Sequence, residues 1–165
     1  MAWRTKVAAA VAGFLFAVFG SSVAHAAPPT DACSLLTSAE VSAALGVSVG
    51  AGEKIVPNST ALCGWEVPGE KSMDRKRVVL SIYTQMGSRT PVDRFNAAKT
   101  PMKGITKEPV SGVGDDAIFA TTPGFGTGLI FRKGNAAFDV RVYGFPVDQL
   151  KAKEKTLAQS VLAKL

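Results

Sequence analysis

The stretch that decides the fold is DACSLLTSAEVSAALG at residues 31–46, together with ALCGW at residues 61–65. Between them, these two segments hold both cysteines of the chain, Cys33 and Cys63. The first segment has the pattern of a short helix, and the second has the alternation of a strand that carries Trp65. We therefore expect a helix that a disulfide joins to a strand.

The helix has clear signals at both ends. Thr37 and Glu40 are three residues apart, which is the spacing of a capping box at a helix N-terminus. Gly46 is a typical stop, because glycine readily takes the left-handed conformation that ends a helix. The pattern predicts a helix over residues 38–45.

Residues 1–26 have the pattern of a secretory signal peptide. Arg4 and Lys6 precede an apolar run, which ends in the small-x-small cleavage site Ala24-His25-Ala26. Cleavage there would remove the only histidine and two positive charges, so the formal charge would fall from +6 to +4. The alternative is an uncleaved anchor, but the apolar run is shorter than the roughly 20 residues of a membrane span. We expect a periplasmic or secreted protein with no transmembrane segment after cleavage, and one α+β domain over residues 27–165.

Two cysteines in an oxidising compartment are expected to pair. The bond would close a loop of about 30 residues, which the chain-entropy model values at about 3.5 kcal/mol. The alternatives are two free thiols or part of a metal site. A zinc site needs about four ligands from Cys, His and carboxylate, and the mature chain has no histidine. We therefore expect a disulfide, and neither a metal nor another cofactor.

The rest of the chain has further strand and helix patterns. Thr90-Pro91 and Pro146 are each expected to open a helix, because proline favours the first turn. Apolar alternation predicts strands around residues 53–56, 62–67, 77–84, 117–120, 129–132 and 136–143. This order favours an α+β sandwich in which helices pack on an antiparallel sheet.

The last strand and the last helix each have one apolar side. In the strand, the residues expected to face the core are Phe138, Val140 and Val142. Those expected to face water are Asp139, Arg141 and Tyr143, and one buried face with one wet face is typical of an antiparallel sheet. The core side of the final helix is expected to contain Leu150, Leu157, Val161 and Leu165.

The mature chain offers little for catalysis. Without histidine, nucleophilic mechanisms of the Ser-His and Cys-His types are excluded. The carboxylates are scattered apart from Asp115 and Asp116, and adjacent residues on a strand point to opposite faces. These two are expected in a turn, although a calcium site without the EF-hand pattern stays open. Because no basic stripe interleaves with aromatic residues, we expect no nucleic-acid partner.

The candidate binding residues are Trp65, Asp115, Asp116 and Phe125. Trp65 could be a ligand platform, or a core residue beside the disulfide. Phe125 lies in TTPGFGTG at residues 121–128, a predicted glycine-rich loop. It could touch a partner, or it could fold inward over a hairpin.

The segments CSLLTSAEV at residues 33–41 and CGW at residues 63–65 resemble motifs of small exported bacterial proteins of unknown function, many of them lipoproteins. GVGDDA at residues 112–117 and a terminal Leu-Ala-x-x-Val-Leu helix add to the likeness, which covers nearly all of the mature chain. The resemblance implies a PsbP-type α/β/α sandwich. A lipobox is missing before Cys33, which argues against lipid attachment. Since the family has no agreed activity, the resemblance implies a fold and a location only.

We therefore expect an exported, non-catalytic binding module whose partner is a protein or a cell-wall ligand. One variant is an inhibitor or immunity protein that blocks an exported enzyme through the loop at residues 121–128. An interaction role predicts an exposed apolar patch near that loop. The alternative is a carboxylate-based envelope hydrolase, which needs two acids about 5–9 Å apart across a cleft.

Overall fold

The computed structural model describes residues 28–70 and 75–165. The expected signal peptide lies outside the described residues. A short 3-10 turn, η1 (Ala32–Ser34), precedes three α-helices, which are α1 (Ser38–Leu45), α2 (Pro91–Lys99) and α3 (Val147–Leu162). The strands are β1 (Glu53–Lys54), β2 (Leu62–Glu66), β3 (Arg77–Ile82), β4 (Thr106–Pro109), β5 (Asp116–Thr122), β6 (Gly126–Lys133) and β7 (Ala136–Tyr143).

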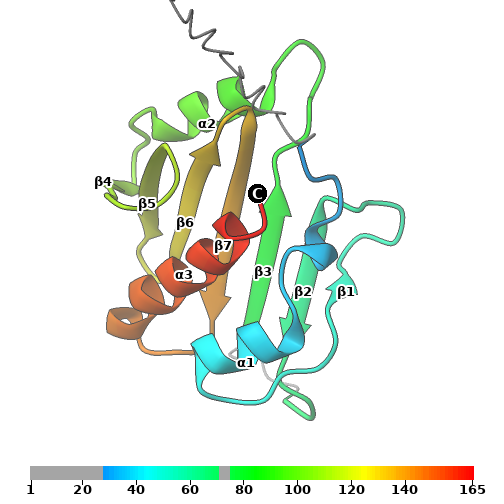
Figure 1. Ribbon diagram of the computed structural model, residues 1–165. Helices are drawn as coiled ribbons and strands as arrows, with labels where there is room; N and C mark the ends of the chain where they lie inside the picture. Colours follow the sequence, from blue (N-terminus) through cyan, green and yellow to red (C-terminus); the bar gives the residue numbers. More distant parts are fainter. Residues whose placement is uncertain (1–27, 71–74) are drawn as a thin grey trace, which may run out of the picture.

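The strands form one seven-stranded sheet in the order β1-β2-β3-β7-β6-β5-β4. Every neighbouring pair is antiparallel. The chain builds β1 to β3 from one edge inward, crosses through α2 to the far edge, and returns through β4, β5 and β6 (Figure 1). The last strand, β7, therefore closes the sheet by pairing with β3 in its centre.

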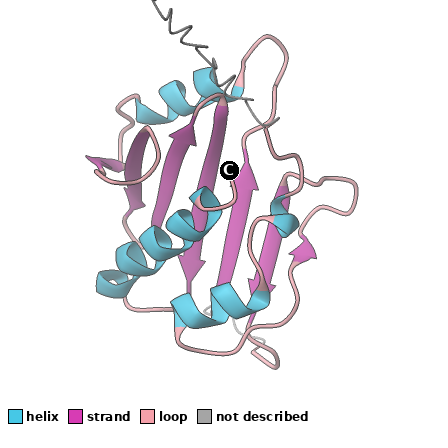
Figure 2. Cartoon of the chain, in the orientation of Figure 1, coloured by secondary structure: helices cyan, strands magenta, loops and turns pink. Residues whose placement is uncertain are grey.

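Helices cover both faces of the sheet, which confirms the predicted α+β sandwich. Figure 2 shows α1 and α3 crossing in front of the strands. The larger core lies beneath them and includes Val78 and Leu80 of β3 and Leu157 and Val161 of α3. A second core lies on the opposite face, where Phe95 of α2 packs against Ile118, Ala120, Ile130 and Ala137.

The helix α1 has the predicted bounds and the predicted caps. The Thr37 hydroxyl accepts a hydrogen bond from the Glu40 N–H, and the Glu40 carboxylate accepts one from the Thr37 N–H, as a capping box requires. Gly46 ends the helix with a φ of 75°. Val41 and Leu45 are buried and turn the apolar side of α1 toward the larger core.

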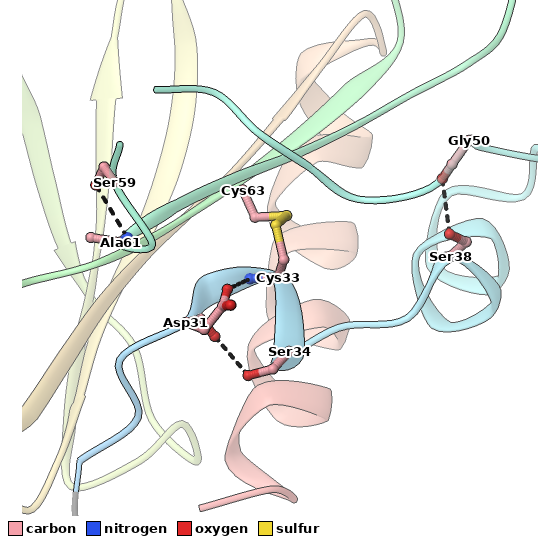
Figure 3. The surroundings of a disulfide bond; sticks show 8 residues. All are labelled: Asp31, Cys33, Ser34, Ser38, Gly50, Ser59, Ala61 and Cys63. Carbon is pink, nitrogen blue, oxygen red and sulfur yellow. Dashed lines mark hydrogen bonds between the residues drawn. A yellow bond between two sulfur atoms is a disulfide. The ribbon is translucent and has the colours of Figure 1, made fainter. Parts of the chain in front are cut away.

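The predicted disulfide is present between Cys33 and Cys63, whose Cα atoms are 5.1 Å apart. It joins η1 to β2, as Figure 3 shows. Beside it, the Ala32 N–H donates a hydrogen bond of 2.7 Å to the Thr60 carbonyl. The entry to α1 is tied down further on, where the Ser38 hydroxyl donates to the Gly50 carbonyl at 2.9 Å.

Two expectations about chain segments were wrong. Most of the predicted loop at residues 121–128 is strand, because β5 continues to Thr122 and β6 starts at Gly126. Leu165 was expected on the core side of the last helix, but it lies beyond the end of α3 and is 38% exposed. Within the part of the chain that the structure describes, no helix has the length and apolar character of a membrane span.

Candidate functional site

Trp65 is a core residue and offers no surface to a ligand. Its side chain is 1% exposed and lies in the larger core with Cys63. The backbone of Gly52 comes so close that a Cβ there would lie 2.7 Å from Trp65 Nε1. The indole is therefore enclosed by the β1 side of the sheet, and we assign it a packing role.

Asp115 and Asp116 bind different parts of the structure. Asp115 accepts hydrogen bonds from the Gly134 N–H at 2.7 Å and from Lys133 Nζ at 3.2 Å, which lower its pKa. Asp116 pairs with Lys99 at the end of α2. The two carboxylates thus anchor the β6–β7 turn and a helix end, and the structure does not bring them together. Among residues 28–70 and 75–165, no cluster of three or more His, Cys, Asp or Glu side chains is placed to hold a metal.

Phe125 lies at the tip of the turn between β5 and β6 and is 81% exposed. The turn is tight, because the Phe125 N–H donates to the Thr122 carbonyl at 3.0 Å. Gly126 sits against α3, where a Cβ on it would lie 3.4 Å from Leu150. Val147, at the start of α3, is 62% exposed. The β5–β6 tip and the start of α3 therefore present exposed apolar side chains at the same end of the molecule.

A larger candidate surface lies on the α2 side of the sheet. There, α2 covers β5, β6 and the first residues of β7, but the side chains farther along β7 and on β3 and β2 stay at least partly exposed, except that of Asp139, which is buried. We call this area the open sheet face. Its residues are Gly64, Glu66, Arg77, Val79, Ser81, Asp139, Arg141 and Tyr143, and cross-strand pairing places them in rows.

The open sheet face is hollowed toward the β1 edge. A cavity of about 490 Å³ lies beside β2; we call it the hollow. Its apolar lining includes Ile55, Gly64 and Val79, and its charged lining includes Glu66, Arg75 and Arg77. This volume is in the range of about 300–1,000 Å³ that small-molecule sites have.

The charged groups at the centre of the open sheet face bind each other. Arg141 Nη2 donates to Asp139 Oδ2 at 3.0 Å, and Arg141 Nε also reaches both carboxylate oxygens. Burial raises the pKa of Asp139, and the Arg141 guanidinium partly offsets that rise. A Cβ on Gly128 would lie 3.0 Å from Arg141 Cγ. Glycine at this position therefore gives Arg141 room to lie flat on β6.

Two arginines of the open sheet face and its border stack on tyrosines. The guanidinium carbon of Arg77 lies 4.6 Å from the ring centre of Tyr143. The same distance separates Arg94 of α2 from the ring of Tyr83. Burial, helped by the negative charge of Asp139, raises the pKa of Tyr83 to about 12. The open sheet face thus presents arginines held flat by aromatic rings, which is a common arrangement for recognising anions.

The most unusual buried group is Glu154 of α3, which is completely buried. The β6–β7 pairing stops at Leu129 and Val140, although each strand continues along its other neighbour. Glu154 fills this opening, and its Oε1 accepts a hydrogen bond of 3.2 Å from the Val142 N–H. Its Oε2 has no partner among the described residues. Burial raises the pKa of Glu154 to about 8, so the carboxyl is largely protonated at neutral pH.

Sequence reasoning missed Glu154 and the open sheet face for different reasons. The stripe of Leu150, Leu157 and Val161 has a gap at the position of residue 154, and that gap was the signal for a buried acid. Of the residues of β7 expected to face water, Arg141 and Tyr143 are partly exposed, but Asp139 is buried, because Arg141 lies against it. Local alternation does not say which part of a face a helix or a long side chain will cover. Comparison with protein-family models, curated proteins and solved structures finds no match to the chain.

Proposed function

We propose that this protein is an exported, non-catalytic binding module that holds its ligand on the open sheet face. The observation that carries the proposal is the uneven cover of the sheet. Helices cover both hydrophobic cores. On the open sheet face, by contrast, Arg77, Val79 and Tyr143 remain partly exposed beside a hollow of about 490 Å³. An uncovered sheet surface with arginine, tyrosine and a concave edge has the composition of a binding surface.

The location is part of the proposal. It rests on the n-region, apolar run and cleavage pattern of residues 1–26. The Cys33–Cys63 disulfide is compatible with an oxidising compartment outside the cytoplasm. The partner is a protein or a cell-wall component, since both occur there.

A variant of Val79 tests the binding surface. Val79→Lys places a long charged side chain in the middle of the open sheet face. The immobilised mature protein, residues 27–165, is expected to capture a component from an envelope extract, measured by quantitative mass spectrometry. We expect V79K to capture about tenfold less, since the few residues that dominate binding energy cluster at the centre of an interface and a loss of about 1.4 kcal/mol is a factor of ten in affinity.

The matched control is Gln159→Lys, which adds the same charge to the exposed side of α3 on the other face of the sheet. Both variants are first checked for cooperative thermal unfolding. Support comes only from a component that wild type and Q159K retain and V79K loses. Equal capture by V79K and wild type, or no capture at all, would show that the open sheet face is not the binding surface.

The exposed tip of the β5–β6 turn favours a second candidate function, that of an inhibitor or immunity protein. Phe125 is 81% exposed on a short turn flanked by glycines, and Val147 adds apolar surface nearby. A protruding aromatic side chain on a tight turn is suited to enter the cleft of another exported protein.

Phe125→Ser separates the two functions. Because the side chain is exposed, we expect the free energy of unfolding to change by less than about 0.5 kcal/mol. If the tip blocks an enzyme, F125S loses that enzyme from the captured set, while Met86→Ser, a change of another exposed apolar residue, keeps it. An F125S protein that captures the same components as wild type would rule out the tip as a contact.

A carboxylate-based hydrolase is the remaining alternative. Glu53 and Glu66 both line the hollow, from neighbouring strands. Glu66, however, is held by Arg75 at 3.0 Å, and both acids are exposed. A glycosidase holds its general acid in an apolar site, so this arrangement favours binding over hydrolysis.

A further inference from the structure

Arg77 is an arginine of the open sheet face to which the described residues offer no carboxylate. Within residues 28–70 and 75–165, Arg75 pairs with Glu66 and Arg141 pairs with Asp139, whereas no carboxylate lies within ion-pair distance of Arg77. Its Nε is buried and has no hydrogen-bond partner in the same part of the chain. A buried donor without an acceptor costs free energy, so an acceptor supplied from outside would be stabilising.

Among the described residues, the charged groups that line the hollow leave an excess of one positive charge. The basic ones are Lys54, Arg75 and Arg77, and the acidic ones are Glu53 and Glu66. The ion pair with Arg75 accounts for Glu66. A ligand with one negative charge therefore matches the hollow better than a cation or a polyanion.

The guanidinium of Arg77 is also preorganised to bind a planar anion. Its stacking on Tyr143, at 4.6 Å from the ring centre, holds its plane in place. A guanidinium held in this way loses less side-chain freedom when it binds, and its paired N–H groups match the two oxygens of a carboxylate.

The remaining lining suits a short apolar group. Val79 and Ile55 supply apolar surface, and Gly64 lies between them on β2. A Cβ on Gly64 would lie 3.2 Å from Ile55 Cγ1. Glycine at this position therefore lets Ile55 lie over β2 and form a wall of the hollow.

We propose that the hollow binds a small ligand with a free carboxylate, which Arg77 binds while Ile55 and Val79 contact the ligand's apolar part. The proposal rests on the open sheet face being the binding surface, and it names the ligand chemistry. The hollow is large enough for an acylated dipeptide with an apolar last residue.

The test compares N-acetyl-alanyl-leucine with its carboxamide, in which a neutral NH2 group replaces one carboxylate oxygen and the negative charge is lost. Binding to the mature protein is followed by chemical-shift changes in two-dimensional NMR spectra. We expect the acid to bind saturably with a Kd of about 1 mM and the amide about tenfold more weakly or worse. The shifted resonances are expected to include Ile55, Gly64 and Val79.

Three variants assign the effect to Arg77. We expect Arg77→Gln to reduce the affinity for the acid to that of the amide, and Arg77→Lys to lie between, because lysine keeps the charge but not the planar fork. Arg89→Gln removes the same charge from an exposed position before α2, and it is expected to bind the acid like wild type.

Equal affinity for acid and amide, or no saturable shift up to about 10 mM of the acid, would overturn the carboxylate site. Because the acid–amide comparison uses the wild-type protein, it does not depend on the folding of R77Q. If envelope capture is still lost in V79K, the open sheet face remains the binding surface and only the ligand chemistry is wrong. If V79K and wild type capture equally, the wider proposal fails as well.

Discussion

Reducing the Cys33–Cys63 disulfide is expected to lower the free energy of unfolding by about 3.5 kcal/mol, and the midpoint of thermal unfolding by about 10 °C. The bond closes a loop of 30 residues. Without it, the unfolded chain gains the conformational freedom that this loop restricts. The folded chain also loses the covalent link between η1 and β2, which are otherwise held by backbone contacts such as Ala32 to Thr60.

The measurement compares denaturant unfolding of oxidised protein, reduced protein and the Cys33→Ala/Cys63→Ala variant. Alanine is preferred to serine, because Cys63 is fully buried and a hydroxyl there would need a partner. The matched control is Ser34→Ala, which removes a hydrogen bond to the Asp31 carbonyl in the same turn but leaves the disulfide intact. If oxidised and reduced protein unfold at the same denaturant concentration, the link does not stabilise the fold.

Local signals account for the elements that were predicted well. The capping box of Thr37 and Glu40 and the stop at Gly46 define α1 without help from the rest of the chain. Thr90 and Pro91 define the start of α2 in the same way, since Thr90 accepts a hydrogen bond from the Asp93 N–H. Such signals act over three or four residues, and they are therefore visible in the sequence alone.

The strands that were missed or shortened depend on distant partners. The segment TKEP of β4 has no apolar alternation, and it becomes a strand because β5 offers an edge for pairing. Gly126 and Gly128 were read as parts of a loop, but both lie in β6. Gly128 faces Arg141, and the space that the arginine needs comes from the neighbouring strand. Neither cause can be read from the local sequence.

In the candidate site, too, some features follow from the local sequence and others depend on distant parts of the chain. The alternation of β7 predicted which side chains face away from the larger core. It did not predict that α2 stops short of Arg141 and Tyr143, because that depends on how a nine-residue helix lies across the sheet. The hollow forms only when β1, β2 and β3 come together, and no pattern within one segment predicts that Arg77 lies beside Ile55 and Val79 in its lining.

Glu154→Gln is expected to make the protein more stable at neutral pH, by about 3 kcal/mol at pH 7. The pKa of Glu154 is about 8 in the folded protein, against an ordinary value of 4.5. The folded state therefore holds this proton more tightly than the unfolded chain does. The contribution of Glu154 to stability is complete below about pH 4.5 and is lost as the pH rises to about 8.

Glutamine has nearly the same shape as a protonated glutamic acid side chain, but it does not gain or lose a proton with pH. Its carbonyl oxygen can accept the hydrogen bond of the Val142 N–H, and its NH2 group replaces the hydroxyl at the Oε2 position, which has no partner in the described part of the chain. The cost of that unsatisfied donor is similar in both proteins and largely cancels in the comparison. What remains is the free energy of protonating the buried carboxyl, which only wild type requires.

The measurement is the difference in unfolding free energy between wild type and E154Q across about pH 4 to pH 9. We expect the difference to be close to zero at the acid end, to grow with pH, and to level off above about pH 8. Glu53→Gln is the matched control, because Glu53 is an exposed glutamate on β1.

The charges that act on Glu154 are those of Asp139 and Arg141 on β7 and of Lys151 on α3. They remain in the variant, so their own titration largely cancels from the difference between the two proteins. A difference that stays constant with pH would mean that Glu154 has the same pKa in the folded protein as in the unfolded chain. The opening between β6 and β7 would then hold an ionised carboxylate at neutral pH. Hydrogen-bond donors in addition to the Val142 N–H would be needed to stabilise that buried charge.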